Sequence, residues 1–177
     1  MNRPPAPPPA RDEPESTGRR RAARRVALAA LTACLDLPAL AAAPARAPDG
    51  ERIGRTFSAF CDTLVPADAL TPAASTLGVP NEILGDVRGN LLGERLVAAG
   101  CAWLDAECGG DFAGAAELAR VAALERMQAM PWESPAGRFF VVMRNTVMAD
   151  YYVQPVSWRG LALDRPPQPL GFFDAIR

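Results

Sequence analysis

The spacing of apolar residues between positions 51 and 152 is the feature that most constrains the fold of this chain. In the first stretch, large apolar residues recur at i, i+4, i+7, i+8 and i+11, which is one face of a helix. These residues are Ile53, Phe57, Phe60, Cys61 and Leu64. No window alternates apolar and polar residues with the β-branched content that a strand needs. The sequence therefore predicts an all-α fold, a small bundle of about five helices.

Proline and glycine divide the body into these helices. Pro66 ends the first helix, and Pro80 is placed to open a second. Either this second helix continues to Leu104, or a successor helix follows it and reaches Leu104. A helix over 114–130 follows the loop at residues 108–111, and Ser134 is placed to cap the last helix, with Pro135 in its first turn. The core positions predicted on these helices are Ile83, Leu84, Val87, Leu91, Leu92, Leu96, Val97, Cys101, Leu104, Leu118, Val121, Leu124, Met127, Phe139, Phe140, Met143, Val147 and Tyr151.

The C-terminal tail, residues 153–177, has a different composition from the helices. Its high content of Pro and Gly predicts an extended and irregular segment. The tail is also rich in aromatic residues, which polar linkers do not carry. We therefore expect it to pack either on its own bundle or on a partner.

The composition limits the chemistry that the chain itself performs. All 19 basic residues are Arg, and the chain contains neither Lys nor His. The absence of His excludes Ser-His and Cys-His nucleophile pairs and imidazole metal ligands, and the absence of Lys excludes Schiff-base enzymes and P-loop nucleotide binding. The acidic residues Asp62, Asp68, Asp105, Glu107 and Asp111 are expected on solvated faces rather than as acid–base pairs. We expect no catalytic, cofactor-binding or metal-binding residue in this chain.

The net charge of −1 combines two segments of opposite sign. Residues 1–47 hold eight Arg and four acidic residues, whereas the remainder holds 11 Arg and 16 acidic residues. An acidic body has no bulk electrostatic reason to bind nucleic acid. We therefore predict two parts: a targeting segment over 1–47 and a helical domain over 48–177.

The N-terminal segment has the layout of an export signal. Its first 18 residues are rich in Pro and are predicted to be disordered. A cluster of Arg and then a short, Ala-rich apolar run follow, as in a secretory signal and unlike a membrane span. Arg24, Arg25 and Leu28 resemble a twin-arginine (Tat) signal, and the alternative is a general secretory signal with an arginine-rich front.

The sequence offers more than one site at which this signal could be processed. Cleavage after Ala41 satisfies the A-x-A rule, whereas cleavage after Ala47 would place Pro48 at the cleaved bond. Residues 31–34, Leu-Thr-Ala-Cys, also match a lipoprotein box in which Cys34 would be acylated.

Three cysteines follow the signal, an odd number for an oxidising compartment. Cys61, Cys101 and Cys108 are the candidates for a disulfide. On one continuous helix Cys101 and Cys108 lie too far apart to pair, so they pair only if the helix ends near Ala106, and otherwise Cys61 pairs with one of them. The alternative is that these thiols are buried and inert.

Two segments resemble the gluconate 2-dehydrogenase subunit 3 family. The first is the helix end and turn FCDTLVPAD at residues 60–68, with Pro72 and residues 78–79 after it. The second is the C-terminal string YYVQPVSWRGL at residues 151–161, followed by PPQPLGFFD at residues 166–174. Residues 100–108 are similar to the central helix of that family, so the resemblance covers about residues 52–177.

The resemblance implies a small subunit without a cofactor in an exported sugar or sugar-acid dehydrogenase. It implies that a large subunit of the glucose-methanol-choline oxidoreductase type holds FAD and that a cytochrome c subunit with haem c often passes electrons to the membrane. The small subunit would bring its partner through the Tat translocon to the periplasm and support its maturation. The residues expected to contact the partner are Tyr151, Tyr152, Pro155, Trp158, Pro166, Pro167, Gln168, Pro169, Gly171, Phe172 and Asp174. The alternative is a stand-alone exported helical module or lipoprotein.

Overall fold

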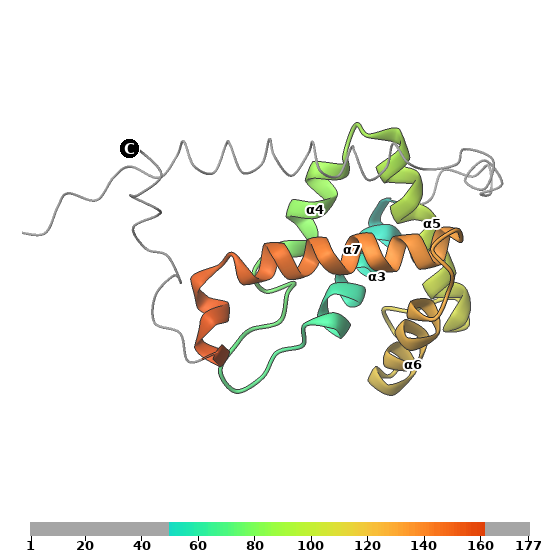
Figure 1. Ribbon diagram of the computed structural model, residues 1–177. Coiled ribbons are helices and arrows are strands. Elements are labelled where there is room, and N and C mark those ends of the chain that lie inside the picture. Colours follow the sequence, from blue (N-terminus) through green and yellow to red (C-terminus); the bar gives the residue numbers. More distant parts are fainter. Residues whose placement is uncertain (1–49, 162–177) are drawn as a thin grey trace, which may run out of the picture.

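The computed structural model describes residues 50–161, which form five α-helices and one short 3-10 helix and include no strand. Labelled as in Figure 1, these are α3 (Gly50–Leu64), α4 (Val79–Val87), α5 (Leu91–Glu107), α6 (Glu117–Gln128), α7 (Pro135–Tyr152) and the 3-10 helix η1 (Pro155–Leu161). The predicted all-α bundle is confirmed. Helix α7 crosses the middle of the bundle in Figure 1 and contacts each of the other described helices.

Local signals in the sequence set several helix ends. The Ser134 side chain caps α7 by accepting a hydrogen bond from the backbone amide three residues later, and Pro135 lies in the first turn, as predicted. Between α4 and α5 the chain turns at Gly89, which has φ of 84°, and Asn90 caps α5. Of the two alternatives predicted for this stretch, the structure has the second, in which a successor helix follows the one that Pro80 opens. Leu91 begins the second of them and is 60% exposed, which corrects its prediction as a core residue.

The core is an aromatic cluster where α3, α5 and α7 meet. The ring of Phe139 on α7 lies 5.0 Å from that of Phe60 and 6.3 Å from that of Phe57, between ring centroids. On its other side, Phe139 lies so close to the backbone of α5 that a Cβ added to Gly100 would overlap the ring. All three aromatic side chains are buried. The missing side chain at Gly100 thus lets α5 approach α7 closely.

Helix α6 departs from the prediction in its start and in its buried face. It begins at Glu117, three residues later than expected. Leu124 and Met127 are buried as predicted, but Leu118 is 83% exposed and Val121 is 37% exposed. Three residues rotate by about 60° less than a full helical turn. Residues spaced by three therefore shift around the helix axis at each step and do not stay on one face. Leu118 and Met127 therefore lie on opposite sides of α6.

Asp105 is buried rather than solvated, which corrects its assignment to a polar face. Its Oδ2 accepts a hydrogen bond from Arg52 Nε (2.7 Å), and its Oδ1 accepts from Thr56 Oγ1 (2.9 Å) and the Phe112 amide (3.1 Å). Arg52 also donates to the carbonyl of Gly110 (2.7 Å). One carboxylate thereby joins α3, the end of α5 and the loop before α6, and its four lone-pair sites explain why an acidic residue is tolerated there.

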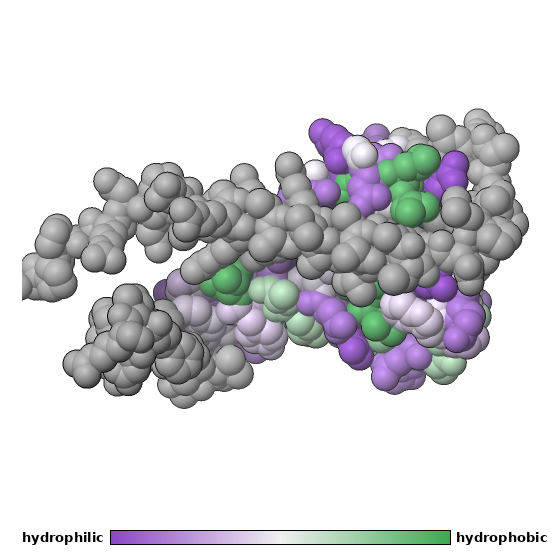
Figure 2. All heavy atoms as spheres, turned by 45° about the horizontal axis from the view of Figure 1, so that its top comes forward, coloured by the Kyte–Doolittle hydropathy of each residue, from purple (hydrophilic) through white to green (hydrophobic). Residues whose placement is uncertain are grey.

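The surface is mainly polar, with separate apolar patches. Figure 2 shows hydrophilic residues over most of the described surface in view and small hydrophobic areas between them. Exposed apolar side chains concentrate in two stretches. One comprises α6 and the turn after it, with Leu118, Val121, Met130 and Trp132, and the other comprises the loop after α3 and the end of α7, with Leu70, Tyr152 and Val153.

Replacing Gly100 by Ala tests the close approach of α5 and α7. We expect Gly100→Ala to lower the free energy of unfolding by about 1–3 kcal/mol, because Phe139 must shift to admit the methyl group. Gly85→Ala is the matched control, because no heavy atom lies within 4 Å of an added Cβ there, and we expect it to stabilise α4 by about 0.5–1 kcal/mol. Urea unfolding of the full chain measures the change in unfolding free energy for each variant. Equal changes would contradict the close contact between Gly100 and Phe139.

Replacing Asp105 by Asn tests the buried carboxylate. The amide keeps one acceptor oxygen but turns an NH₂ group toward Arg52 or toward the Thr56 and Phe112 donors, so we expect a loss of about 1–3 kcal/mol in unfolding free energy. The control is Glu107→Gln in the exposed Arg126–Glu107 pair, which we expect to change it by less than about 1 kcal/mol. A larger effect at Glu107 than at Asp105 would refute the role of burial.

Candidate functional site

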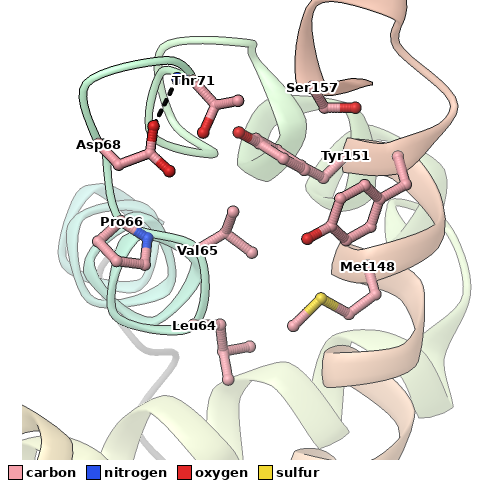
Figure 3. Close-up of a pocket in the computed structure, with 9 residues that line it drawn as sticks. Leu64, Val65, Pro66, Asp68, Thr71, Met148, Tyr151 and Ser157 are labelled. Atoms are coloured by element: carbon pink, nitrogen blue, oxygen red, sulfur yellow. Dashed lines mark hydrogen bonds between the residues drawn. The ribbon is translucent and has the colours of Figure 1, made fainter. Parts of the chain in front are cut away.

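A pocket of about 260 Å³ lies where the end of α3 and the loop after it meet the C-terminal end of α7 and η1 (Figure 3). It is lined by Leu64, Val65, Pro66, Asp68, Thr71, Met148, Tyr151, Tyr152 and Ser157. The turn after the first helix and the C-terminal tyrosine pair, which both carry the family resemblance, therefore meet in one place. We treat this pocket as the candidate functional site and refer to it as the α7 groove.

Asp68 fixes the loop on one side of the α7 groove. Its backbone amide donates to the Thr71 carbonyl (2.9 Å), and its Oδ1 accepts from the amides of Leu70 (2.7 Å) and Thr71 (2.6 Å). The hydrogen bonds from these two amides hold the pKa of the Asp68 carboxyl below its usual value. No Arg within residues 50–161 forms an ion pair with Asp68. A negative charge therefore lies at the rim of the groove.

Tyr151 and Tyr152 differ in exposure although they are adjacent. Tyr151 is 1% exposed, and its hydroxyl donates to the carbonyl of Pro72 (2.7 Å), which ties α7 to the loop after α3. Tyr152 is 44% exposed, and its ring stands edge-on to that of Tyr151 with the centroids 5.2 Å apart. Of these two predicted interface residues, Tyr152 lies at the surface and Tyr151 belongs to the interior.

The start of the tail is helical rather than extended, which corrects the prediction for this part. The Ser157 hydroxyl donates to the carbonyl of Gln154, and Trp158 Nε1 donates to that of Tyr152, both at 2.7 Å. Side chains thus satisfy the last carbonyl of α7 and one carbonyl just beyond the helix, and η1 packs against α7. Within η1, the predicted interface residue Pro155 is exposed and Trp158 is half-buried.

The remaining predicted residues lie outside the part of the chain that the structure describes. In the tail these are Pro166, Pro167, Gln168, Pro169, Gly171, Phe172 and Asp174, and in the N-terminal segment they are Arg24, Arg25, Leu28 and Cys34. The predicted boundary at residue 47 lies there as well. The roles of these residues in export and in partner contact stay predictions.

The three cysteines of the described chain are free thiols. Cys61 on α3 and Cys101 on α5 are buried in the core, and burial raises the pKa of both well above its usual value. Helix α5 runs through Cys101 to Glu107, so Cys108 lies about 10 Å further along the axis and out of disulfide range. The thiols at Cys61 and Cys101 therefore act as small hydrophobic groups of the core.

Hydrogen bonds within the chain engage three of the polar side chains that line the α7 groove. The Asp68 carboxylate accepts from amides of the loop, Tyr151 donates to the Pro72 carbonyl, and Ser157 donates to the carbonyl of Gln154 in the turn between α7 and η1. In residues 50–161, no three Cys, Asp or Glu side chains are grouped so that they could hold a metal ion. The described helices also include none that is long and apolar enough to cross a membrane. The groove favours binding of an apolar side chain over a chemical step.

Sequence reasoning missed Met148 as part of this site, and it missed Leu70, which does not line the groove but lies in the loop that does. Leu70 lies between Asp68 and Thr71 and is 61% exposed, and a large apolar residue inside a turn was the signal that could have identified it. Met148 lines the groove because it lies three and four positions before the two tyrosines, on the same helix face.

Comparisons with known proteins give one finding. A family model described as gluconate 2-dehydrogenase subunit 3 matches residues 52–162. No curated protein and no solved structure matches the chain. The match covers the α7 groove, including the loop after α3, the end of α7 and η1.

Replacing each tyrosine by Phe tests how the α7 groove is held together. We expect Tyr151→Phe to lower the free energy of unfolding by about 1 kcal/mol, because the Pro72 carbonyl loses its donor. Tyr152→Phe is the matched control: its hydroxyl makes no hydrogen bond within the described residues, so we expect a change below about 0.5 kcal/mol. Urea unfolding of the full chain compares the two, and equal losses would rule out the bond to Pro72 as the cause.

Proposed function

Because the chain belongs to the gluconate 2-dehydrogenase subunit 3 family, we propose that it is the non-catalytic small subunit of an exported, FAD-dependent dehydrogenase of sugars or sugar acids. The observation that carries this proposal is the family match over residues 52–162, which includes every helix that forms the α7 groove. In the complex, the chain stabilises a large flavoprotein subunit and supports its maturation. The complex itself oxidises gluconate or a related sugar and passes the electrons to an acceptor.

The proposed division of labour assigns the chemistry to the partners. A large subunit of the glucose-methanol-choline oxidoreductase type would hold FAD, and a cytochrome c subunit with haem c would receive the electrons. The composition of this chain supports the assignment, because a protein without His and Lys lacks imidazole, the most frequent general base, and the amine that forms Schiff bases. The internally bonded polar groups of the α7 groove support it too.

Export is the second role that we propose. The Arg cluster at residues 19–25 and the apolar run after it suit a Tat signal, with Arg24, Arg25 and Leu28 as the residues that the translocon reads. The Tat pathway carries folded cargo, so a flavoprotein without a signal of its own would cross the membrane bound to this chain. The complex would then work in the periplasm, held at the inner membrane through its partners.

The alternative function is a stand-alone exported module. The lipoprotein box that ends at Cys34 favours this alternative, since an acylated chain would reach the membrane without a partner. Purification of the full chain from its native host separates the two functions. A flavoprotein that co-purifies with it supports the subunit, whereas a lone chain supports the module.

Replacing Arg24 and Arg25 together by Lys tests the export role. We expect the large flavoprotein to stay in the cytoplasm and most periplasmic dehydrogenase activity to be lost, because the Tat signal requires its arginine pair. The control is the charge-matched double variant Arg20→Lys with Arg21→Lys, which we expect to export normally. Fractionation followed by an activity assay with an artificial acceptor measures both. Undiminished periplasmic activity in the Arg24/Arg25 variant would refute carriage of the partner by this signal.

A further inference from the structure

We propose that the α7 groove receives an apolar side chain of the large flavoprotein subunit, with an Arg or Lys of the same partner segment paired to Asp68. This inference rests on the proposed function, because it names where and by what chemistry that subunit docks. It is carried by the form of the groove, the apolar residues exposed at it and the charge at its rim.

The form of the groove is set by bonds that exist before any partner binds. The Tyr151 hydroxyl holds the loop through the Pro72 carbonyl, and Asp68 closes the turn at Thr71. A pocket of about 260 Å³ between these two bonds holds one large side chain, and Figure 3 shows Leu64, Val65 and Met148 on its walls. Because the pocket is already formed, little conformational entropy is lost when a partner binds. The residues that contribute most to binding energy concentrate in preformed pockets of this kind.

The apolar residues exposed at the groove favour a protein partner. Tyr152 lines the pocket and is 44% exposed, Val153 directly after it is 40% exposed, and Leu70 in the facing loop is 61% exposed. A partner segment whose anchor fills the pocket would cover Tyr152, and Val153 and Leu70 are adjacent in the chain to Tyr152 and Thr71, which line the pocket. Tyr in particular is enriched among the residues that dominate binding energy.

The charge at the rim specifies the partner segment further. Backbone amides keep Asp68 ionised, and no Arg in the described part of the chain neutralises it. The body of the chain is acidic as a whole, with 16 acidic residues against 11 Arg after residue 47. A basic side chain next to the apolar anchor would complement both features and raise the rate of encounter.

The exposed face of α6 is the competing surface. It presents Leu118, which is 83% exposed, and Val121, which is 37% exposed, but neither residue lines the α7 groove. Truncating Leu118 therefore serves as a control of the same kind as truncating Tyr152, because both remove an exposed apolar side chain from a helix.

The experiment measures binding of the full chain to the flavoprotein that co-purifies with it from the native host. We expect Tyr152→Ala to raise the dissociation constant about tenfold or more and Leu118→Ala to change it by less than about twofold. Asp68→Asn keeps the Oδ1 acceptor that closes the turn but removes the charge, so we expect a loss of severalfold and a weaker dependence of binding on salt. Thermal unfolding confirms that each variant is folded.

The outcomes separate this inference from the proposed function. If the wild-type chain binds the flavoprotein and neither Tyr152→Ala nor Asp68→Asn weakens binding, the docking site is wrong and the subunit role stands. Loss of binding in Leu118→Ala alone would assign the interface to α6 and overturn the proposal. If no flavoprotein binds the wild-type chain, the proposed function fails, and the inference fails with it.

Discussion

The ring of Phe139 lies directly against the backbone of Gly100, and the bundle depends on this contact. Any side chain at Gly100 would push α5 away from α7. Because α7 contacts every other described helix, such a shift would be transmitted to all of them. Phe57 and Phe60 on α3 pack on the same ring, so three helices share one aromatic cluster. Dense packing of this kind makes the relative position of the helices rigid.

Two sets of hydrogen bonds, one near each end of α3, also hold the helices together. Near its start, Asp105 collects hydrogen bonds from Arg52 and Thr56, and beyond its end the Tyr151 hydroxyl binds the Pro72 carbonyl. The Asp105 carboxylate is buried and the Tyr151–Pro72 bond is partly buried, so the cost of leaving either acceptor unpaired favours this geometry. The second connection also shapes the α7 groove, which places Tyr152 and Leu70 at the surface. The stability of the bundle and the presentation of a binding surface therefore have the same physical origin.

A chain without His and Lys fits a role in contact and carriage. Three of the polar side chains at the α7 groove are bonded within the fold, whereas Tyr152 is 44% exposed there. In the complex that we propose, the reactive groups and the cofactor belong to other subunits. The opposite charges of the N-terminal segment and the body agree with this proposal, in which the basic segment would address a translocon and the acidic body a protein partner.

The sequence by itself determined the fold class, the position of most helices and the family. The stripe from Phe57 to Leu64, the Ser134 cap and the turn at Pro66 act through neighbours a few residues away, and such local interactions are readable from the chain. The buried side of α6, and the burial of particular residues elsewhere, were decided only by the tertiary structure. Leu118 is exposed, Asp105 is buried, and Tyr151 turns inward while Tyr152 turns outward. Each of these outcomes depends on a residue 49 or more positions away or on the angle at which two helices meet, as Thr56–Asp105 and Tyr151–Pro72 illustrate. Periodicity along one helix does not contain that information, because it is fixed only when the faces of separate helices pack together.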